Sequence, residues 1–295
     1  MAERVTVIVN PAAGRGRGAK ALPAIRTAFA KHGINDVRTS ASREDEGTLA
    51  ARAVSEGATT IVAAGGDGTW SNVANAILTA GAGSRCRLAM IAAGTGNDFA
   101  KTTGSPSKDI PLTAQLAADG PDTRVDVGKI EQHFFLNIAG FGFDIAVLED
   151  IGNIPWLKGD AVYIYSALRQ IIGYGGVDID VGTRGPKRHL MLIIANAKNF
   201  GGSFRIAPQA SLTDGKLDAI SIHDASAFGR LRLFGAAAKG THIGQPEVTA
   251  EQATRFSLKF GSVPAYETDG EYRRASSAAL EVTCIPQALR VVVPR

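Results

Sequence analysis

The 295-residue chain is poor in the residues that mark several large classes of protein. It has only two cysteines, Cys86 and Cys284, with no metal-ligand spacing to each other or to histidine, so a cysteine-held metal site is excluded. Both suit a reducing compartment and are expected to be small core residues. The five histidines are scattered and form neither a metal-binding spacing nor a Ser/His/Asp pattern.

Long apolar runs are also missing. None approaches the ~18 residues that a membrane-spanning helix needs. Because the strand-like run Arg4–Val9 comes almost at once, we expect no charged and then apolar leader with a cleavage site. We therefore expect a cytoplasmic protein that meets a membrane only at its surface.

Charge of one sign is not in large excess. The 32 Lys and Arg residues against 28 Asp and Glu residues give a formal net charge of +4, which does not predict nucleic-acid binding. This small excess is compatible with an anionic nucleotide or an anionic membrane surface. With 45% hydrophobic residues, the chain can form a sizeable core and two domains.

The first 127 residues alternate strand and helix patterns, which predicts a parallel sheet covered by helices. The expected strands are Val5–Val9, Asp36–Thr39, Thr60–Ala64 and Leu88–Ala92. The expected helices are Ala19–Lys31, Glu46–Glu56, Trp70–Leu78, Gly96–Lys101 and Ser107–Ala118.

Three of these strands run into polar loops, namely Asn10–Gly18, Gly65–Thr69 and Ala93–Asp98. Ligands of open α/β sheets bind beyond the carboxyl ends of the strands, so the three loops predict one site. Glycines between a strand and a helix let a phosphate approach the backbone, while Asp67 would repel it unless a cation or a reacting proton lies between them. The simpler alternative is that Asp67 and Asp98 are helix N-caps.

The first loop does not match two well-known nucleotide motifs. No Gly-Lys-Ser/Thr closes it as in a P-loop, and Gly14-Arg15-Gly16-Arg17-Gly18 lacks the two-residue gap of the dinucleotide fingerprint. Arg15, Arg17 and Lys20 are candidate contacts to phosphate or membrane, with ordinary solvated surface as the alternative.

Beyond residue 127 the pattern changes to short strands, several with a period of two. The expected strands are Phe134–Ala139, His189–Ile194, Leu217–Ile222, Phe256–Phe260 and Ala279–Thr283, and the expected helices are Ala161–Ile172 and Leu231–Ala238. The apolar side chains of the first helix (Tyr163, Ile164, Tyr165, Leu168, Ile171 and Ile172) either pack on the core or line a lipid pocket. We expect an α/β domain over residues 1–127, completed by residues 286–295 with the strand-like Leu289–Val293, and an antiparallel β domain over 128–285.

Three motifs in this order resemble the diacylglycerol kinase catalytic domain family, and within it the bacterial soluble lipid kinases related to sphingosine kinase. They are Asn10-Pro11 with the glycine loop after it, Gly65-Gly66-Asp67-Gly68-Thr69, and Gly94-Thr95-Gly96-Asn97-Asp98-Phe99-Ala100. Asp126-Val127-Gly128, the segment Phe135–Asp144, the segment Pro208–Asp218 and Asp269-Gly270-Glu271 extend the resemblance over nearly the whole chain. It implies a nucleotide-binding α/β domain of the NAD kinase and phosphofructokinase type, followed by a C-terminal antiparallel β-sandwich for the lipid substrate.

The resemblance also implies site residues. The nucleotide-binding positions would be Asn10, Thr39 (or Ser40), Gly65, Gly66, Asp67, Gly68, Thr69, Asn72 and Thr95. Where the family usually has an aliphatic residue and then Asn-Glu-Val, this chain has Trp70-Ser71-Asn72-Val73, and Trp70 is expected in the core rather than in a substrate site.

Two magnesium sites are implied as well. Ser211 and Lys216 would give backbone carbonyls and Asp214 a carboxylate to one ion, although an Asp214-Gly215 turn between strands is the simpler alternative. Asp67, Asp98 and Asp126 would hold the Mg²⁺ that accompanies ATP.

For catalysis, Glu271 resembles the family's general base, and Asp67 is the rival for that role. We therefore expect an ATP-dependent kinase that transfers the γ-phosphoryl group of ATP to a hydroxyl of a diacylglycerol-like or sphingoid-like lipid at a membrane surface. A kinase of a soluble substrate, as in NAD kinase, and a non-catalytic nucleotide- or lipid-binding module are the alternatives. The sequence leaves open which lipid is used and whether a homodimer forms.

Overall fold

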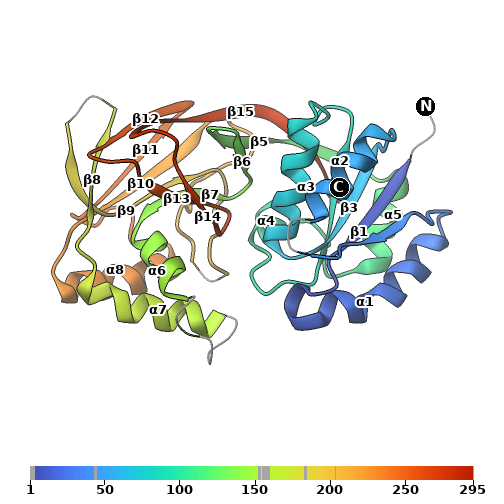
Figure 1. Cartoon of the computed structure of the whole chain (residues 1–295), viewed down its shortest axis with the longest axis horizontal. Coiled ribbons are helices and arrows are strands. Elements are labelled where there is room, and N and C mark those ends of the chain that lie inside the picture. The colour runs from blue at the N-terminus through green and yellow to red at the C-terminus, as the bar shows by residue number, and fades with distance from the viewer. Residues whose placement is uncertain are drawn as a thin grey trace. The chain divides into compact units, whose positions relative to one another are not determined.

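The structure is a computed structural model that describes residues 4–42, 45–151, 154, 160–182, 185–202 and 204–294. Its contacts divide the chain into two units (Figure 1). Unit 1 consists of Met1–Val127 together with Pro286–Arg295, and unit 2 of Gly128–Ile285. Each unit is described below by itself.

Unit 1 has a parallel sheet in the order β2-β1-β3-β4, and the end of β15 lies parallel to β4. The strands are β1 (Val5–Val9), β2 (Val37–Thr39), β3 (Thr60–Gly65), β4 (Arg87–Ala92) and β15 (Ala279–Val292). Strands β1 and β3 are buried along their whole length, as expected when helices cover both faces of a parallel sheet.

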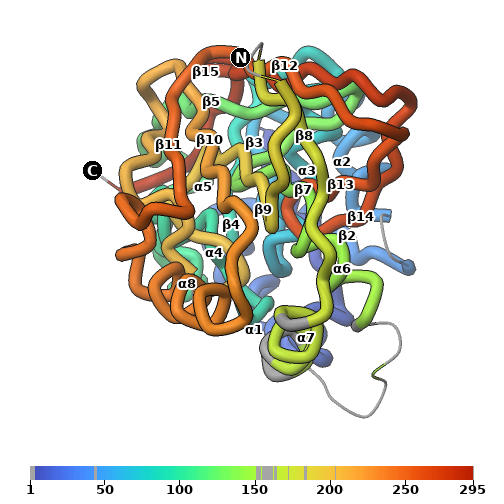
Figure 2. The backbone as a smooth tube through the Cα atoms, turned by 90° about the vertical axis from the view of Figure 1, so that its left-hand side faces the viewer, coloured from blue at the N-terminus to red at the C-terminus, as the bar shows by residue number. Residues whose placement is uncertain are grey.

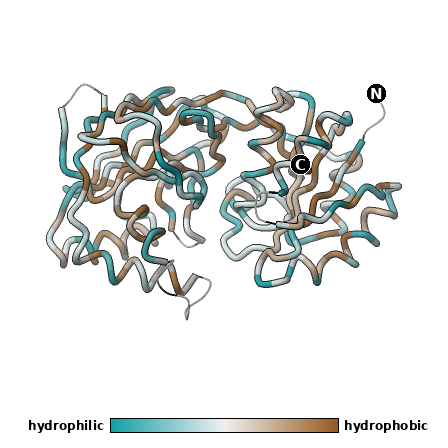
Figure 3. Tube along the Cα trace, in the orientation of Figure 1, coloured by the Kyte–Doolittle hydropathy of each residue, from teal (hydrophilic) through white to brown (hydrophobic). Residues whose placement is uncertain are grey.

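Five helices accompany this sheet: α1 (Ala13–Ala30), α2 (Asp45–Ser55), α3 (Asp67–Thr79), α4 (Asp98–Thr103) and α5 (Ile110–Asp119). Ile25 and Phe29 of α1 and Ala114 of α5 pack in one core cluster with valines of β1 and β3. Figure 3 agrees with this packing. The central strands of unit 1 are hydrophobic there, and α1 alternates between hydrophobic and hydrophilic residues. Trp70 is fully buried and its indole N–H donates to the Ala63 carbonyl at 3.0 Å, which confirms it as a core residue.

Several helix starts differ from the prediction. Helix α1 has left-handed backbone at Gly14, Arg15 and Gly16, so regular helix begins only after this loop, close to the predicted Ala19. Helix α3 begins at Asp67, three residues before the predicted Trp70. The extended Gly66 ends the strand there, and the glycine loop itself forms the first helical turn.

Every strand pairing recorded within unit 2 is antiparallel. Strand β5 (Asp122–Ile130) leads into this unit, and its further strands are β6 (His133–Phe135), β7 (Ile138–Gly142), β8 (Val177–Val181), β9 (Lys187–Ala195), β10 (Leu217–His223), β11 (Val248–Ala253), β12 (Arg255–Phe260), β13 (Ala265–Thr268), β14 (Glu271–Arg274) and the first half of β15. Its helices are α6 (Phe143–Ile151), α7 (Asp160–Gly173) and α8 (Ala227–Lys239).

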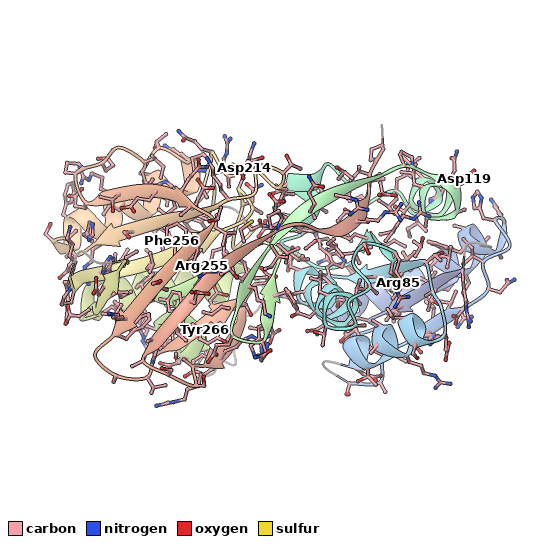
Figure 4. All side chains as sticks on the ribbon, turned by 90° about the horizontal axis from the view of Figure 1, so that it is seen from above. Arg85, Asp119, Asp214, Arg255, Phe256 and Tyr266 are labelled. Atoms are coloured by element: carbon pink, nitrogen blue, oxygen red, sulfur yellow. The ribbon has the colours of Figure 1, made fainter. Side chains whose placement is uncertain are left out.

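The central strands of unit 2 bury both faces. On β9, Leu192 and Ile194 join one core cluster with Tyr266 and Phe256 (labelled in Figure 4), whereas Ile193 joins a second cluster under α6, α7 and α8. Since successive side chains of a strand point to opposite faces, the two clusters lie on the two sides of the same strands. The predicted fold class, an α/β unit followed by an antiparallel β-sandwich, is confirmed.

Two of the expected strands differ from the observed elements. The predicted strand Phe134–Ala139 is wrong as a single strand, because Leu136 and Asn137 separate β6 from β7. The expected Leu289–Val293 is the end of the long β15, and it pairs with β4 of unit 1 as predicted.

Within the described residues, no helix has the length and apolar character required to cross a membrane.

Candidate functional site

Three loops of unit 1 come together at the ends of β1, β3 and β4. A Cβ atom at Gly14 would lie 1.8 Å from the Ala93 carbonyl oxygen, and one at Gly94 would lie 2.5 Å from the Cα of Gly66. Only glycine fits at such contacts, because the backbones themselves touch. The backbone N–H groups of Ala93 and Gly94 also donate to the Gly65 carbonyl, at 2.7 and 3.1 Å.

Asn10 connects the first loop to the second. Its amide nitrogen donates to Thr69 Oγ1 at 3.1 Å, and its side-chain oxygen accepts the N–H groups of Ala12 and Ala13. A Cβ atom at Gly65 would stand 2.3 Å from Thr69 Oγ1, so the strand end must be glycine for Thr69 to lie there. Asn10 thereby fixes both the loop after β1 and the first turn of α3.

Asp67 does not cap its own helix. Its carboxylate accepts the backbone N–H groups of Asn97 (2.6 Å), Asp98 (2.7 Å) and Phe99 (3.3 Å) at the start of α4. It therefore joins the second loop to the third through three of the N–H groups that a helix start leaves without intrahelical partners.

Asp67 and Asp98 form a close pair of acids. A Cβ atom at Gly96 would lie 2.9 Å from Asp67 Oδ2 and 3.4 Å from Asp98 Oδ2, so both carboxylates converge on this glycine. Burial raises the pKa of Asp67 to about 6, and the charge of the nearby Asp98 adds to this effect. The three N–H bonds act in the opposite direction. Asp98 also forms an ion pair with Lys101 at 3.0 Å.

Asn97 is a residue of this site that the sequence analysis quoted without giving it a role. It has left-handed backbone with φ 54°, and its amide nitrogen donates to the Gly94 carbonyl at 3.1 Å. Its amide oxygen is buried without a hydrogen-bond partner, and a Cβ atom at Gly94 would lie 3.2 Å from it. Asparagine tolerates left-handed backbone better than most residues, which is the sequence signal that could have marked it.

The other predicted nucleotide positions are less enclosed. Thr39 ends β2 with an exposed side chain, whereas the alternative Ser40 is buried with its hydroxyl 3.5 Å from Glu46 Oε1. Asn72 is half-buried on α3. Thr95 is exposed and lines a pocket of about 310 Å³ together with Gly96, Asn97, Lys101, Ser107 and Lys108.

The basic residues of the first loop have different surroundings. Arg17 donates to the carbonyl oxygens of Gly14 (3.1 Å) and Gly94 (2.8 Å), and so braces the loops. Arg15 and Lys20 are exposed. Asp126 is fully buried on β5 and accepts the Gln287 N–H at 2.8 Å. In the described part of the chain, no three Asp, Glu, His or Cys side chains are grouped as a metal site.

The second predicted metal loop lies in unit 2, directly before β10. Asp214 is exposed (Figure 4), and its carboxylate accepts the Lys216 N–H at 3.0 Å across a turn in which Gly215 has φ 73°. The Ser211 hydroxyl lies 3.4 Å from the Thr213 hydroxyl and accepts the Thr213 N–H. The Asp-Gly turn is present, at the end of a long connection between β9 and β10.

Glu271 begins β14 and is half-buried. The turn before it consists of Asp269 and Gly270, both with positive φ, as a two-residue hairpin of this type requires. The buried Asp269 carboxylate accepts the N–H groups of Leu136 (2.8 Å), Asn137 (2.8 Å) and Ile138 (3.1 Å). Asp269 thus ties the turn before Glu271 to the gap between β6 and β7.

Two further acids near this hairpin carry no predicted role. A Cβ atom at Gly140 would lie 1.7 Å from Asp144 Oδ2 and 3.0 Å from Glu267 Oε1, so these buried carboxyl groups converge on β7. Burial raises the pKa of Asp144 to about 7, and burial with the Asp144 charge raises the pKa of Glu267 well above its usual value. The pair therefore keeps a proton at neutral pH.

We expect Asp144→Asn to remove part of the pH dependence of stability. A carboxyl whose pKa is higher in the folded than in the unfolded chain binds more protons when folded, so its contribution is present at low pH and is lost as pH rises from about 4 to about 7. We expect the free energy of unfolding, measured by urea titration, to fall between pH 5 and pH 8 by about 2–4 kcal/mol more in the wild type than in the variant.

Asp178→Asn is the control, because Asp178 is exposed and pairs with Arg188 at the surface. It should keep the wild-type pH dependence. An Asp144→Asn protein with an unchanged slope would contradict the shared proton.

Comparisons with known proteins show the family of the chain. The profile of the diacylglycerol kinase catalytic domain matches residues 4–130, and that of the YegS C-terminal NAD kinase beta sandwich-like domain matches residues 137–293. The chain is 29% identical to a diacylglycerol kinase of Mycobacterium tuberculosis, over 99% of this chain and 96% of that protein. It is 28% identical to one of Bacillus subtilis, over 92% of this chain and 90% of that protein.

A solved Bacillus anthracis structure, described as a proposed diacylglycerol kinase, has a TM-score of 0.80 at 21% identity, covering 99% of this chain and 95% of its own. At that identity the likeness supports the fold alone. The family profiles and the relatives named diacylglycerol kinase support a two-domain kinase. Within that class, the chain belongs to the diacylglycerol kinase catalytic domain family.

Proposed function

We propose that the protein is an ATP-dependent lipid kinase that transfers the γ-phosphoryl group of ATP to a lipid hydroxyl. The observation that carries the proposal is the convergence of three glycine loops around the Asp67 and Asp98 carboxylates. The relatives named diacylglycerol kinase support a diacylglycerol-like acceptor.

The phosphates of ATP would bind at the second loop. Gly66 precedes the first turn of α3, where backbone N–H groups and the positive end of the helix dipole favour an anion. Gly66 and Gly94 pack backbone against backbone at that turn, where neither carries a side chain. Asn10 holds Thr69 at the same place, so the loop has one defined conformation.

The acids fit a magnesium ion. Mg²⁺ prefers oxygen ligands and commonly takes one or two carboxylates together with substrate phosphates and water. Asp67 and Asp98 supply two converging carboxylates, and Asn97 adds a buried amide oxygen without a partner. When bound, the ion would neutralise charge on the transferring phosphoryl group. The turn with Ser211, Asp214 and Lys216 is proposed as a second, structural magnesium site.

In the proposed reaction, the lipid hydroxyl oxygen forms a bond to the γ-phosphorus while the bond from the γ-phosphorus to the oxygen bridging it to the β-phosphate breaks, which releases ADP. The hydroxyl proton passes to a carboxylate, and Glu271 is the proposed acceptor. The Asp269–Gly270 turn fixes Glu271, because three backbone N–H groups hold Asp269 in place.

Glu271→Gln should lower kcat by about 10²–10³ while leaving the affinity for Mg·ATP within about twofold, because an amide cannot accept the proton. Steady-state kinetics with ATP and lipid varied in turn test this. Glu281→Gln, at an exposed glutamate of β15, is the control and should behave as wild type. A Glu271→Gln enzyme with normal kcat would remove Glu271 from the chemistry and leave Asp67 as the base.

The reaction itself is tested with pure protein, labelled ATP, Mg²⁺ and a panel of diacylglycerols and sphingoid alcohols. Transfer of label to a lipid supports the proposal. Clean transfer to a soluble acceptor such as NAD, with none to lipid, would favour a kinase of a soluble substrate. Nucleotide binding without any transfer would favour a non-catalytic module.

A further inference from the structure

The acid pair of Asp144 and Glu267 is bonded to the turn that precedes Glu271. Glu267 is fully buried on β13, and Asp144 is buried in the first turn of α6. Glu267 Oε1 and Asp144 Oδ2 both lie close to where a Cβ atom of Gly140 would be, at 3.0 and 1.7 Å. Burying two acids this close together is costly unless they share a proton, so the pair needs an explanation beyond packing.

The second carboxyl oxygen of Glu267 reaches the turn itself. Glu267 Oε2 accepts the Gly270 N–H at 2.5 Å, and Gly270 has φ 87°. Thr268 pairs with Glu271 across this two-residue hairpin. Asp269 and Glu267 therefore hold the turn through separate bonds, and Glu267 fixes the residue next to Glu271.

A shared proton allows the two acids to stay together. Within the described residues, Glu267 Oε1 and Asp144 Oδ2 are buried and have no hydrogen-bond partner other than each other. A carboxylic acid donates one hydrogen bond and a carboxylate only accepts, so one proton joins the two groups. Without that proton, two buried charges would repel each other at short range, and Glu267 would have to move.

Charged and titratable groups lie on the elements packed around the pair. They are Glu149 on α6, Tyr174 after α7, Arg188 on β9, and Asp269, Glu271 and Arg273 at the hairpin. Arg188 pairs with Asp178 at 2.9 Å, and Arg273 donates to the Thr268 hydroxyl at 2.7 Å. Burial raises the pKa of Glu267, and the charges of the nearby acids add to this effect. The surroundings therefore favour keeping the proton.

Helix α6 supports the hairpin at a second place as well. The Tyr272 hydroxyl donates to Glu149 Oε1 at 3.2 Å, and Figures 1 and 2 both show α6 beside β13 and β14. Phe143, next to Asp144, packs in one core cluster with Ile171 of α7. The side chains of Tyr163, Ile164 and Ile172 on α7 lie outside the described residues. Asp144 thus belongs to a helix that is anchored in the core and bonded to the hairpin.

We propose that the proton shared by Asp144 and Glu267 holds the Asp269–Gly270 turn in place, which makes Glu267 a positioning residue for Glu271. The proposal rests on the proposed function in that Glu271 accepts the proton of the lipid hydroxyl. When the pH rises and the pair loses its last proton, the two carboxylates repel each other, and Glu267 moves together with the turn that it binds. A displacement of about 1 Å at a reacting group costs about 10²-fold in rate.

The pH profile of kcat tests the shared proton, measured with labelled ATP, Mg²⁺ and a short-chain diacylglycerol at saturation. For the wild type, kcat should fall at least about fivefold between pH 7 and pH 9. Glu267→Gln and Asp144→Asn should each remove this fall, because an amide donates to the remaining carboxylate at any pH. Glu281→Gln, at the exposed surface of β15, is the control and should keep the fall.

Glu267→Leu removes both the acceptor of the Gly270 N–H and the shared proton. Its kcat at pH 7 should fall about 10–10²-fold while KM for Mg·ATP stays within about twofold, because the glycine loops belong to unit 1. Glu267→Gln should stay within about threefold of wild type at pH 7, because its amide oxygen still accepts that N–H. If the leucine variant does not fold, the two amide variants decide. Amide variants that retain the wild-type fall in kcat would overturn the proposal.

Tryptic cleavage at Arg274, exposed on β14, reports on the hairpin without the reaction. Relative to a free peptide of the same sequence, cleavage of the wild type should quicken at least about fivefold from pH 7 to pH 9, and that of Glu267→Gln should not. A wild type that transfers no label to lipid would contradict the proposed function, while the cleavage rates still decide whether the pair holds the turn. Equal cleavage of wild type and Glu267→Gln at pH 9 would overturn that role.

Discussion

Asp67→Asn should reduce phosphoryl transfer by about 10³-fold or more, the largest loss expected of any single substitution in unit 1. The substitution removes one of two converging charges that would hold the metal with ATP. It also places an NH₂ group against backbone donors of Asn97 and Asp98, where the carboxylate now accepts at 2.6 and 2.7 Å. Both effects disturb the junction between the second and third loops.

Comparing Asp67→Asn with Glu271→Gln separates a role in holding Mg·ATP from a role in accepting the proton. Asp67→Asn should weaken Mg·ATP binding as well as kcat, measurable by calorimetry with a non-hydrolysable ATP analogue and Mg²⁺. Asp45→Asn is the control, since Asp45 is in the first turn of α2 and accepts the exposed Ala41 N–H nearby. An Asp67→Asn protein that binds Mg·ATP normally and loses only turnover would make Asp67 the base.

The pH profile of the wild type follows from the same carboxylate. Because the pKa of Asp67 is raised to about 6, lowering the pH through that value protonates it and removes its charge from the site. Affinity for Mg·ATP should therefore fall between pH 7 and pH 5 by up to about tenfold for each pH unit below 6. Binding that is unchanged over this range would contradict the role of Asp67 in holding the metal.

The three-loop site could be anticipated from sequence because its parts are local. Each loop follows a buried strand, and the carboxyl ends of parallel strands lie at one edge of a sheet. Its internal connections could not be read in the same way. Asp67 is of a residue type that often caps a helix start, and it lies at the start of α3. Its carboxylate nevertheless accepts an N–H group at the start of α4, 31 residues further along the chain. Only the packing of β3 against β4 decides which helix it caps.

Unit 2 shows the same limit more strongly. The sequence pattern predicts the strands β9 and β10. It does not predict the acid pair of Asp144 and Glu267, because these two residues meet only after β7 and β13 pair. The run Phe134–Ala139 has the composition of one strand. It breaks at Leu136 and Asn137 because a carboxylate 132 residues away from Asn137 accepts its N–H. Local pattern predicts elements, and long-range polar contacts decide where they stop.

That carboxylate belongs to Asp269, and Asp269→Ala should cost about 3–5 kcal/mol of stability, the largest loss expected in unit 2. It would leave the buried N–H groups of Leu136, Asn137 and Ile138 without their acceptor. It would also place alanine at φ 52°, a left-handed conformation that costs about 1–2 kcal/mol for such a residue. Thermal melting should show a decrease of roughly 10 °C or more.

Asp214→Ala is a closely matched control. Asp214 also precedes a glycine in a turn, but it is exposed and accepts one local N–H, so in buffer without divalent cations its loss should cost less than about 1 kcal/mol. Asp269→Asn separates the two causes, because asparagine tolerates left-handed backbone and retains one accepting oxygen. It should fall between wild type and Asp269→Ala. If it were as stable as wild type, the loss in the alanine variant would come from backbone strain, and the bonds to the β6–β7 gap would contribute little.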